Sequence, residues 1–299
     1  MSRTSFNEAS VNKLVLEAFG SGFDNYQTKY QSIFNVFSPE RQDELFSITA
    51  RESNLQELPE NSPYPSAPIK EIGRKELQFR TEYKDSINVS KLMNRFDNYS
   101  AVIREANKLG YNMKVQMDKI GAAVLNNATS AAPEHAVWDG LSLANAAHKI
   151  GETGNTQSNI VNGALGESTL VDMYTLMQTQ QDHAGNPQPM NMATVVYHPS
   201  KAQKVYETLR SPNDPESGNR NVNFLYTFGY DFVEHPLLTN TEDVHMLAGK
   251  NFHRLMYGIA LAPEVNKIKA EATGNDLYQC CFSAQAGAVD YIGYGLISN

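Results

Sequence analysis

The chain contains 299 residues, of which 41% are hydrophobic, enough to bury the core of one large domain or of two small ones. Its formal net charge of -8 argues against a dedicated nucleic-acid binder, so we expect any contact with DNA to be weak. No stretch is apolar enough to predict a membrane span, and residues 1–20 lack the apolar core of a signal peptide, which favours a soluble protein made in a cytosol.

The first segment, from Val11 to Phe37, is rich in aromatic residues and is interrupted by Gly20 and Gly22. We interpret it as an arm with short helical pieces, whose apolar side needs a partner such as another subunit. The sequence Ser38-Pro39-Glu40 follows, with serine as N-cap and proline at the first helical position. This pattern predicts a short helix that ends near Phe46.

The segment from Ile48 to Val89 has a different character, with prolines crowded between Pro59 and Pro68. From Leu77 to Tyr83 apolar and polar residues alternate, and Ile87 and Val89 continue the alternation, which predicts a strand with one covered face. About forty residues is long for a simple connection inside a compact domain. The segment is therefore either an extended functional loop or a disordered insert.

A long amphipathic helix is predicted next, from about Asn98 to Asn126. Its apolar residues recur at intervals of three and four: Val102, Ala106, Leu109, Met113, Met117, Ile120 and Val124. At a rise of about 1.5 Å per residue the helix would be roughly 40 Å long, and Gly110 should weaken it modestly. We expect it to lie across a whole domain as a spine.

The remaining elements complete an α+β chain whose strands are concentrated late. We expect helices at 165–178 and 201–209, the second with Ser200 and Gln203 as a capping box, and a surface loop at 211–223. The breakers in 182–187 should end the first of these helices. Strands are predicted at 193–197, 232–234, 245–247, 256–262, 265–270 and 277–294.

His135, Asp139 and His148 are the residues that could form a metal or acid-base cluster, because histidine and aspartate are competent ligands. Their spacing matches no known site pattern, and Asp139-Gly140 is more simply a turn. A metal-dependent hydrolase that uses these three residues is the alternative from another functional class. No other catalytic motif occurs, so we predict no catalytic, cofactor-binding or metal-binding residue and no enzyme activity.

We interpret three further groups of reactive residues as structural or solvated rather than functional. Cys280 and Cys281 are adjacent in a predicted strand, so their side chains should point to opposite faces and act as small hydrophobes rather than as a shared metal site. Asp182-His183 lies among breakers and should be solvated. Lys70 and Lys75 lie in the long loop, where we expect solvated charges and infer no covalent bond.

The order of elements resembles the major capsid proteins of tailed phages, which have the Hong Kong 97-type fold, and in detail the Mu-like major head subunits. The resemblance runs from about Phe46 to the C-terminus. It is carried by DGLSLANAAH (139–148), TQSN (156–159), ALGESTLVDMYTLMQTQQDHAGNP (164–187), VVYHP (195–199), LRS (209–211) and, in the returning strand of the loop, INVSK (87–91). The chain departs from this pattern at Ala144, where the family commonly has an aromatic residue.

The resemblance implies an N-arm (1–41), an extended E-loop (42–90), a peripheral domain with the spine helix (91–197 and 256–299) and an axial domain (198–255). It implies self-assembly into the pentamers and hexamers of an icosahedral shell that encloses double-stranded DNA. The expected partners are copies of the chain itself, a scaffold, a portal protein and, as a further candidate, a decoration protein, with weak non-specific DNA contact and no membrane. The expected location is the virion capsid, preceded by the host cytoplasm. A cellular nanocompartment shell of the same fold is the alternative.

Overall fold

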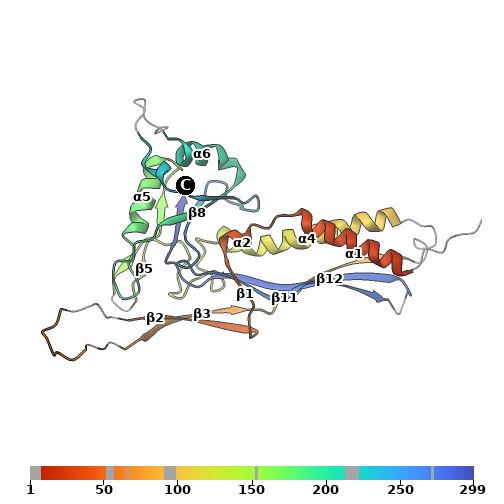
Figure 1. The fold of residues 1–299 in the computed structure, drawn as a ribbon, viewed down its shortest axis with the longest axis horizontal. Helices are drawn as coiled ribbons and strands as arrows, with labels where there is room; N and C mark the ends of the chain where they lie inside the picture. Colours follow the sequence, from red (N-terminus) through yellow and green to blue (C-terminus); the bar gives the residue numbers. More distant parts are fainter. Residues whose placement is uncertain are drawn as a thin grey trace, which may run out of the picture.

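The computed structural model describes residues 8–51, 57–64, 66, 68–90, 99–151, 154–212, 222–270 and 273–299. The molecule is elongated: a long body carries an upper lobe at one end, and a two-stranded ribbon lies below this lobe (Figure 1). Helices and sheets are mixed, which confirms the α+β class expected from the sequence. None of the helices in the described ranges is long and apolar enough to cross a membrane.

The body is built on a four-stranded sheet, and the helices α1 (Glu8–Asn25) and α4 (Tyr99–Asn126) lie along it (Figure 1). The strands lie in the order β1 (Asn35–Phe37), β11 (Leu255–Lys269), β12 (Asp276–Ala288) and β4 (Tyr83–Val89). Strand β1 runs parallel to β11, whereas the other two pairs are antiparallel. The two strands expected at 256–262 and 265–270 are therefore one long strand, which continues past Pro263 with register shifts on either side of Leu261.

The expected spine helix is confirmed as α4 (Tyr99–Asn126), the longest helix of the described chain. Six members of its apolar stripe, from Val102 to Ile120, are buried, and Val124 packs against the same core. The stripe faces the sheet, where the Tyr257 hydroxyl donates a hydrogen bond of 2.9 Å to the carbonyl oxygen of Met117. Burial of apolar side chains along the whole helix, rather than helix propensity, holds the spine in place.

The N-terminal arm differs from the expectation, because Gly20 and Gly22 do not break it. Helix α1 (Glu8–Asn25) continues through both glycines and packs along α4. A Cβ atom on Gly22 would lie 1.9 Å from the backbone oxygen of Asn107, and one on Gly110 would lie 2.2 Å from that of Phe19. Glycine at these two positions therefore lets the two helix backbones approach closely.

Asp118 of α4 fixes the chain where the arm turns into the body. Its fully buried carboxylate accepts hydrogen bonds of 2.9 Å from the backbone N–H groups of Lys29 and Tyr30, at the start of α2 (Tyr30–Ile33). The Tyr30 ring stacks on Tyr257 of β11 at 4.2 Å. A buried carboxylate is stable here because donors from the helix N-terminus satisfy it.

The ribbon consists of β2 (Asp43–Ala50) and β3 (Lys70–Gln78), an antiparallel pair. The helix predicted from Ser38 to Phe46 is wrong: Pro39 lies in an irregular stretch, and β2 begins at Asp43. Pairing with β3 and edge-to-face packing of Phe46 on Phe37 outweigh the local helix-start signal. The alternation from Leu77 to Val89 belongs to two strands, because β3 ends at Gln78 and β4 joins the body sheet.

The upper lobe surrounds a five-stranded sheet whose strand order is β7, β13, β10, β8, β9. The expected elements are confirmed with shifted ends, and 277–294 divides into β12 and β13. The bounds are α5 (Glu167–Gln178), α6 (Ala202–Arg210), the 3-10 turns η1 (Pro199–Lys201) and η2 (Phe224–Thr227), and the strands β5 (His148–Lys149), β6 (Thr156–Gln157), β7 (Ile160–Asn162), β8 (Met192–Tyr197), β9 (Asp231–Glu234), β10 (Val244–Ala248) and β13 (Tyr294–Ser298). The domain bounds implied by the resemblance assign β8 and β13 to the peripheral domain and β9 and β10 to the axial domain. In the structure all four strands belong to this one sheet.

The lobe differs from the sequence-based prediction before α6, and it leaves most of the predicted loop after α6 untested. Ser200 does not form the predicted capping box with Gln203: the His198 ring accepts the hydrogen bond from the backbone N–H of Ser200 and begins the turn that precedes α6. The loop expected at 211–223 falls mostly outside the described residues. Its last residue, Asn223, is fully buried and donates to the carbonyl oxygens of Thr208 and Ser211.

The close approach of α1 and α4 predicts opposite effects for two glycine substitutions. We expect Gly110→Ala to lower the free energy of unfolding by about 1–2 kcal/mol, since forced separation of the helices outweighs the gain of about 1 kcal/mol in helix propensity. Gly20→Ala, whose Cβ meets nothing within 4 Å, should instead raise stability by about 1 kcal/mol. Urea unfolding of the two variants measures both values, and a stabilised Gly110→Ala would contradict the packing argument.

Candidate functional site

Two of the three polar residues that the sequence singled out meet in the structure. The Oδ2 atom of Asp139 lies 2.9 Å from Nδ1 of His148, and both side chains are fully buried. His135 takes no part in this contact. It is half-buried in the preceding turn, where its backbone N–H donates to the carbonyl oxygen of Ala132.

Both ring nitrogens of His148 lie within hydrogen-bond distance of protein oxygen atoms. Nε2 lies 3.2 Å from the carbonyl oxygen of Leu143, and the ring stacks on Tyr291 with 4.0 Å between centroids and 7° between planes. Because each nitrogen faces an oxygen acceptor, no nitrogen lone pair is directed at a ligand. The imidazole is placed as a packing and hydrogen-bonding group.

Asp139 performs the turn function expected of an Asp-Gly pair. Gly140 has a φ of 78°, and the backbone N–H of Leu141 donates to Oδ1 of Asp139 at 3.0 Å. Burial alone would raise the pKa of Asp139. Hydrogen bonds from His148 and from the backbone N–H groups of Leu141 and Lys149, with the charge of His148, outweigh it and hold the pKa below its usual value.

The TQSN stretch joins the same network. The Asn159 side chain, fully buried, donates to the carbonyl oxygen of Leu143 at 2.7 Å and accepts from the backbone N–H of Asn145. Gln157 donates to the Tyr291 hydroxyl at 3.0 Å and to the carbonyl oxygen of Gln181. We call Asp139, His148, Gln157, Asn159 and Tyr291 the polar junction; it ties the loop after the spine helix to the last strands.

A second histidine-aspartate pair lies beside the polar junction and corrects the expectation that Asp182-His183 is simply solvated. His183 is buried, with Nε2 2.8 Å from Oδ2 of Asp290, and its ring packs edge-on against Trp138. The indole N–H of Trp138 donates to the other oxygen of Asp290 at 3.2 Å. No local signal reveals this pair, because Asp290 lies 107 residues further along the chain.

The two pairs do not form a metal site. Across the part of the chain that the structure describes, no group of three or more His, Cys, Asp or Glu side chains could hold an ion. The carboxylates accept hydrogen bonds from neighbouring backbone and side chains instead. These carboxylates are buried polar groups with hydrogen-bond partners, and such groups stabilise one conformation of the surrounding loops over the alternatives.

The two cysteines lie on opposite faces of β12 as expected, but only Cys280 is a buried small hydrophobe. Cys280 is buried on the side of β12 that faces α4, whereas Cys281 is partly exposed, with Sγ 3.2 Å from Oε1 of Glu264 on the opposite face. Burial is the main cause that raises the pKa of the Cys280 thiol. Both residues are free thiols of a strand rather than a shared site.

Lys75 departs from the expectation, whereas Lys70 is exposed as expected. Lys75 is only 8% exposed, and its Nζ donates to the carbonyl oxygen of Pro133 at 2.9 Å. Burial lowers the pKa of this amine, an effect that the nearby Glu134 opposes. The alternation of β3 already places Lys75 on the same face as Leu77, so the sequence held the signal for its inward direction.

The ribbon is fixed to the body at its base. A Cβ atom on Gly73 of β3 would lie 2.4 Å from the Trp138 ring, and one on Gly287 would lie 2.4 Å from the Leu77 side chain. Arg254 Nη1 lies 3.4 Å from the carbonyl oxygen of Ser47 in β2. The ribbon is thus held by apolar and polar contacts while its tip projects beyond the lobe (Figure 1).

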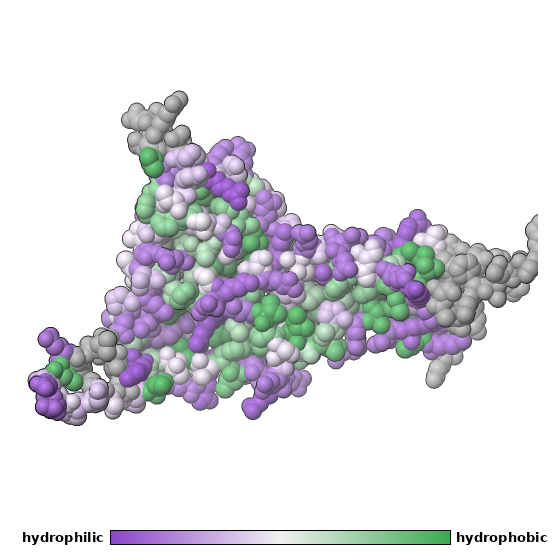
Figure 2. All heavy atoms as spheres, viewed as in Figure 1, coloured by the Kyte–Doolittle hydropathy of each residue, from purple (hydrophilic) through white to green (hydrophobic). Residues whose placement is uncertain are grey.

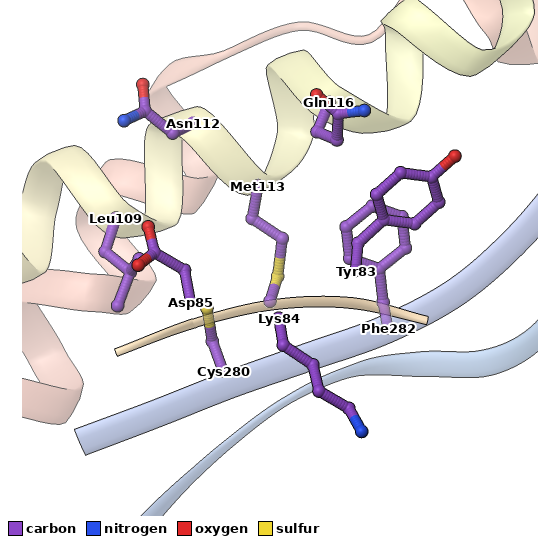
Figure 3. A pocket seen from close by; sticks show the side chains of 9 residues that line it. All are labelled: Tyr83, Lys84, Asp85, Leu109, Asn112, Met113, Gln116, Cys280 and Phe282. Atoms are coloured by element: carbon purple, nitrogen blue, oxygen red, sulfur yellow. The ribbon is translucent and has the colours of Figure 1, made fainter. Parts of the chain in front are cut away.

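A cavity of about 240 Å³ lies between the spine helix and the sheet (Figure 3). Met113 points from α4 toward the sheet, and the stacked rings of Tyr83 and Phe282 close one side, with 5.0 Å between their centroids. Asp85 points toward the helix, whereas its neighbour Lys84 points away. No pair of titratable groups in this cavity is arranged for acid-base chemistry, and we interpret it as a packing gap beside the spine.

Exposed apolar side chains gather on the upper lobe and along the body (Figure 2). On the lobe they include aromatic residues of α6 and η2: Tyr206, Phe224 and Tyr226. Phe224 packs edge-on against Phe228 and Tyr174, so the patch is anchored in a larger aromatic cluster. Apolar surface that is held rigid in this way is typical of an interface between proteins.

Replacement of Asp139 tests whether the polar junction stabilises the fold. We expect Asp139→Asn to lower the free energy of unfolding by about 2 kcal/mol, because the amide keeps the size of the carboxylate but loses the charge-assisted bond to His148. The matched control Asp172→Asn, on the exposed face of α5, should change it by less than about 0.5 kcal/mol. Equal urea midpoints for the two variants would show that the contact carries no stability.

A sequence profile of the family described as phage capsid protein matches residues 80–276, about two thirds of the chain. No curated protein matches the sequence.

Solved structures extend the likeness to almost the whole chain. The virus-like particle from Pyrococcus furiosus superposes with a TM-score of 0.52 at 11% identity, covering 94% of this chain and 96% of the other. The capsid of an empty GTA particle gives 0.54 at 12%, covering 91% and 90%. Microbacterium phage Oxtober96 gives 0.57 at 10%, covering 91% of each chain. At these identities the likeness shows the fold, and it confirms the Hong Kong 97-type architecture.

Proposed function

Because the chain belongs to the phage capsid protein family, we propose that it is the major capsid protein of a tailed bacteriophage, which assembles into an icosahedral shell around double-stranded DNA. The subunits would form pentamers and hexamers. The observation that carries this function is the shape of the subunit: a rigid body and lobe from which a fixed ribbon projects with an exposed tip (Figure 1). Leu58 and Tyr64 in this tip are 43% and 99% exposed, so the tip offers apolar surface to a neighbouring subunit.

We propose that the chain divides into the four parts that the resemblance implies. Residues 1–41 would be the N-arm, 42–90 the E-loop, 91–197 with 256–299 the peripheral domain and 198–255 the axial domain. The body and α4 support the peripheral assignment, and the aromatic patch on α6 and η2 supports contacts of the axial part. The strands β8 and β13 belong structurally to the lobe sheet, so we propose that they act with the axial domain.

The membership of the Mu-like branch and the further partners are also proposals. The branch rests on the DGLSLANAAH and TQSN stretches, whose Asp139, His148, Gln157 and Asn159 form the polar junction. A scaffold and a portal protein are proposed as assembly partners, and a decoration protein as a further one. The net charge of -8 supports only weak, non-specific contact with packaged DNA, and we place the subunit in the host cytoplasm before it enters the virion capsid.

We propose a structural role rather than an enzymatic one. A metal-dependent hydrolase with His135, Asp139 and His148 gains no support, since His135 lies apart and both nitrogens of His148 face oxygen atoms of the protein. The nanocompartment shell is the stronger alternative, because a virus-like particle is among the structures of similar fold. Neighbouring portal and terminase genes would favour the phage capsid, and a neighbouring cargo gene would favour the nanocompartment.

Assembly of the expressed protein tests the function directly. We expect capsomers or closed shells in size-exclusion chromatography and in negative-stain micrographs, with the scaffold partner supplied if the chain needs it. Many identical weak contacts can hold such a shell through multivalency. A stable monomer that never assembles, even with its scaffold, would count heavily against a capsid subunit.

Deletion of the ribbon tip should impair assembly without unfolding the subunit. Removal of Pro59 to Pro68 should leave a folded subunit, because the base of the ribbon is held through Gly73, Lys75 and Leu77, outside the deleted residues. Shell yield should fall by at least about tenfold, since each lost contact is repeated around the shell. Circular dichroism and micrographs of the variant beside the wild type provide the measurement; unimpaired assembly would refute the role of the loop.

A further inference from the structure

A groove of about 380 Å³ lies where the ribbon passes under the upper lobe. One wall is the end of β2 from Ile48 to Arg51, and the other is formed by the loop around Asp182 and His183 and by Phe252 and Arg254. The groove is open to solvent, and polar atoms provide much of its lining. It lies outside the polar junction, but it shares Arg254 with the contacts that hold the base of the ribbon.

Two arginines and two aspartates line this groove. Asp182 accepts hydrogen bonds of 2.8 Å from the backbone N–H groups of Ala184 and Asn186, and Asp290 accepts from Trp138 and His183. Both carboxylates are therefore used within the protein. Within the described ranges, neither of the two arginines of the groove, Arg51 and Arg254, makes an ion pair.

One buried nitrogen in the wall of the groove also lacks a hydrogen bond to the described residues. Nε2 of His183 is engaged with Asp290, whereas its buried Nδ1 has no hydrogen-bond partner among the described residues. Buried polar atoms normally find a partner. With Nε2 donating to Asp290, this Nδ1 is an acceptor, so recognition of a carboxylate falls to the two arginines, whose guanidinium groups match its geometry.

The ribbon tip carries the complementary chemistry. Glu57 and Glu60 are exposed, and Leu58 and Tyr64 add exposed apolar surface to the same stretch. The groove offers an apolar rim as well, since the Phe252 side chain is 58% exposed. The tip projects away from the lobe of its own chain, so it is placed to reach another subunit (Figure 1).

We infer that this groove is a carboxylate-binding site that receives the acidic ribbon tip, with Glu57 and Glu60, of a second copy of the chain. The inference rests on the proposed function, because it requires subunits that lie side by side in an assembly. Arg51 and Arg254 bind the carboxylates, and Phe252 covers the apolar residues of the tip. Arginine also binds phosphate, but two arginines beside two carboxylates suit a short acidic peptide better than the continuous charge of nucleic acid.

A charge-swap experiment tests the pairing. We expect the groove variant Arg51→Glu/Arg254→Glu and the tip variant Glu57→Lys/Glu60→Lys each to lower shell yield by more than about tenfold, because like charges would then face each other. The combined four-residue variant should recover most of the yield. The control Arg41→Glu/Lys119→Glu changes the net charge as much as the groove variant does, at exposed positions outside the groove, and should assemble better than the groove variant.

Cross-linking identifies the partners without reversing any charge. In shells of Arg51→Lys/Arg254→Lys, a carbodiimide should join Glu57 or Glu60 to a lysine of the groove, and a mixture of ¹⁵N-labelled and unlabelled subunits should show that the two peptides come from different copies. Absence of this cross-link, or cross-links only within one copy, would overturn the inference.

The outcomes also separate this pairing from the capsid function itself. A wild type that never assembles with its scaffold contradicts the proposed function. A wild type that assembles, together with a groove variant that assembles equally well, contradicts the groove alone. If the groove variant forms normal shells but retains less DNA, the arginines serve nucleic acid and the tip pairing is wrong.

Discussion

The packing of α4 against α1 and against the body sheet is the contact on which the rest of the structure depends. The apolar stripe of α4 faces the sheet, and Gly110 lets α1 approach it at backbone distance. Asp118 then fixes the chain between α1 and β1. Every other part is placed relative to this body, because one continuous core runs from Leu109 into the sheet of the upper lobe.

The upper lobe joins the body through buried polar contacts as well as through the shared apolar core. The polar junction and the His183–Asp290 pair connect the loop after α4, the turn after α5 and the approach to β13, three segments far apart in sequence. Buried polar groups add less to the free energy of folding than apolar packing does, but each of them finds its hydrogen-bond partners in only a few geometries. We interpret them as the contacts that select one relative placement of these loops.

The ribbon combines a fixed base with an exposed tip, and this division suits an assembling subunit. Contacts at Gly73, Lys75 and Leu77 orient the ribbon before any partner arrives, so little conformational entropy remains to be lost when its tip binds. Each contact between subunits can then be weak, since a closed shell repeats it many times. A charged and apolar tip also limits binding to a surface that matches both kinds of chemistry.

The sequence by itself determined the elements whose signal is local: the spine helix from its three-and-four spacing, the opposite directions of Cys280 and Cys281, and the turn at Asp139-Gly140. It also carried the order of stretches that resembles phage capsid subunits. Only the tertiary structure decided the path of Asp43 to Phe46, where pairing with β3 outweighed a good helix start, and the continuity of α1, where Gly20 and Gly22 serve helix packing. It alone placed Asp290 beside His183 and buried Lys75. These contacts join residues far apart in the chain, so their energies act only once the fold has brought both partners together.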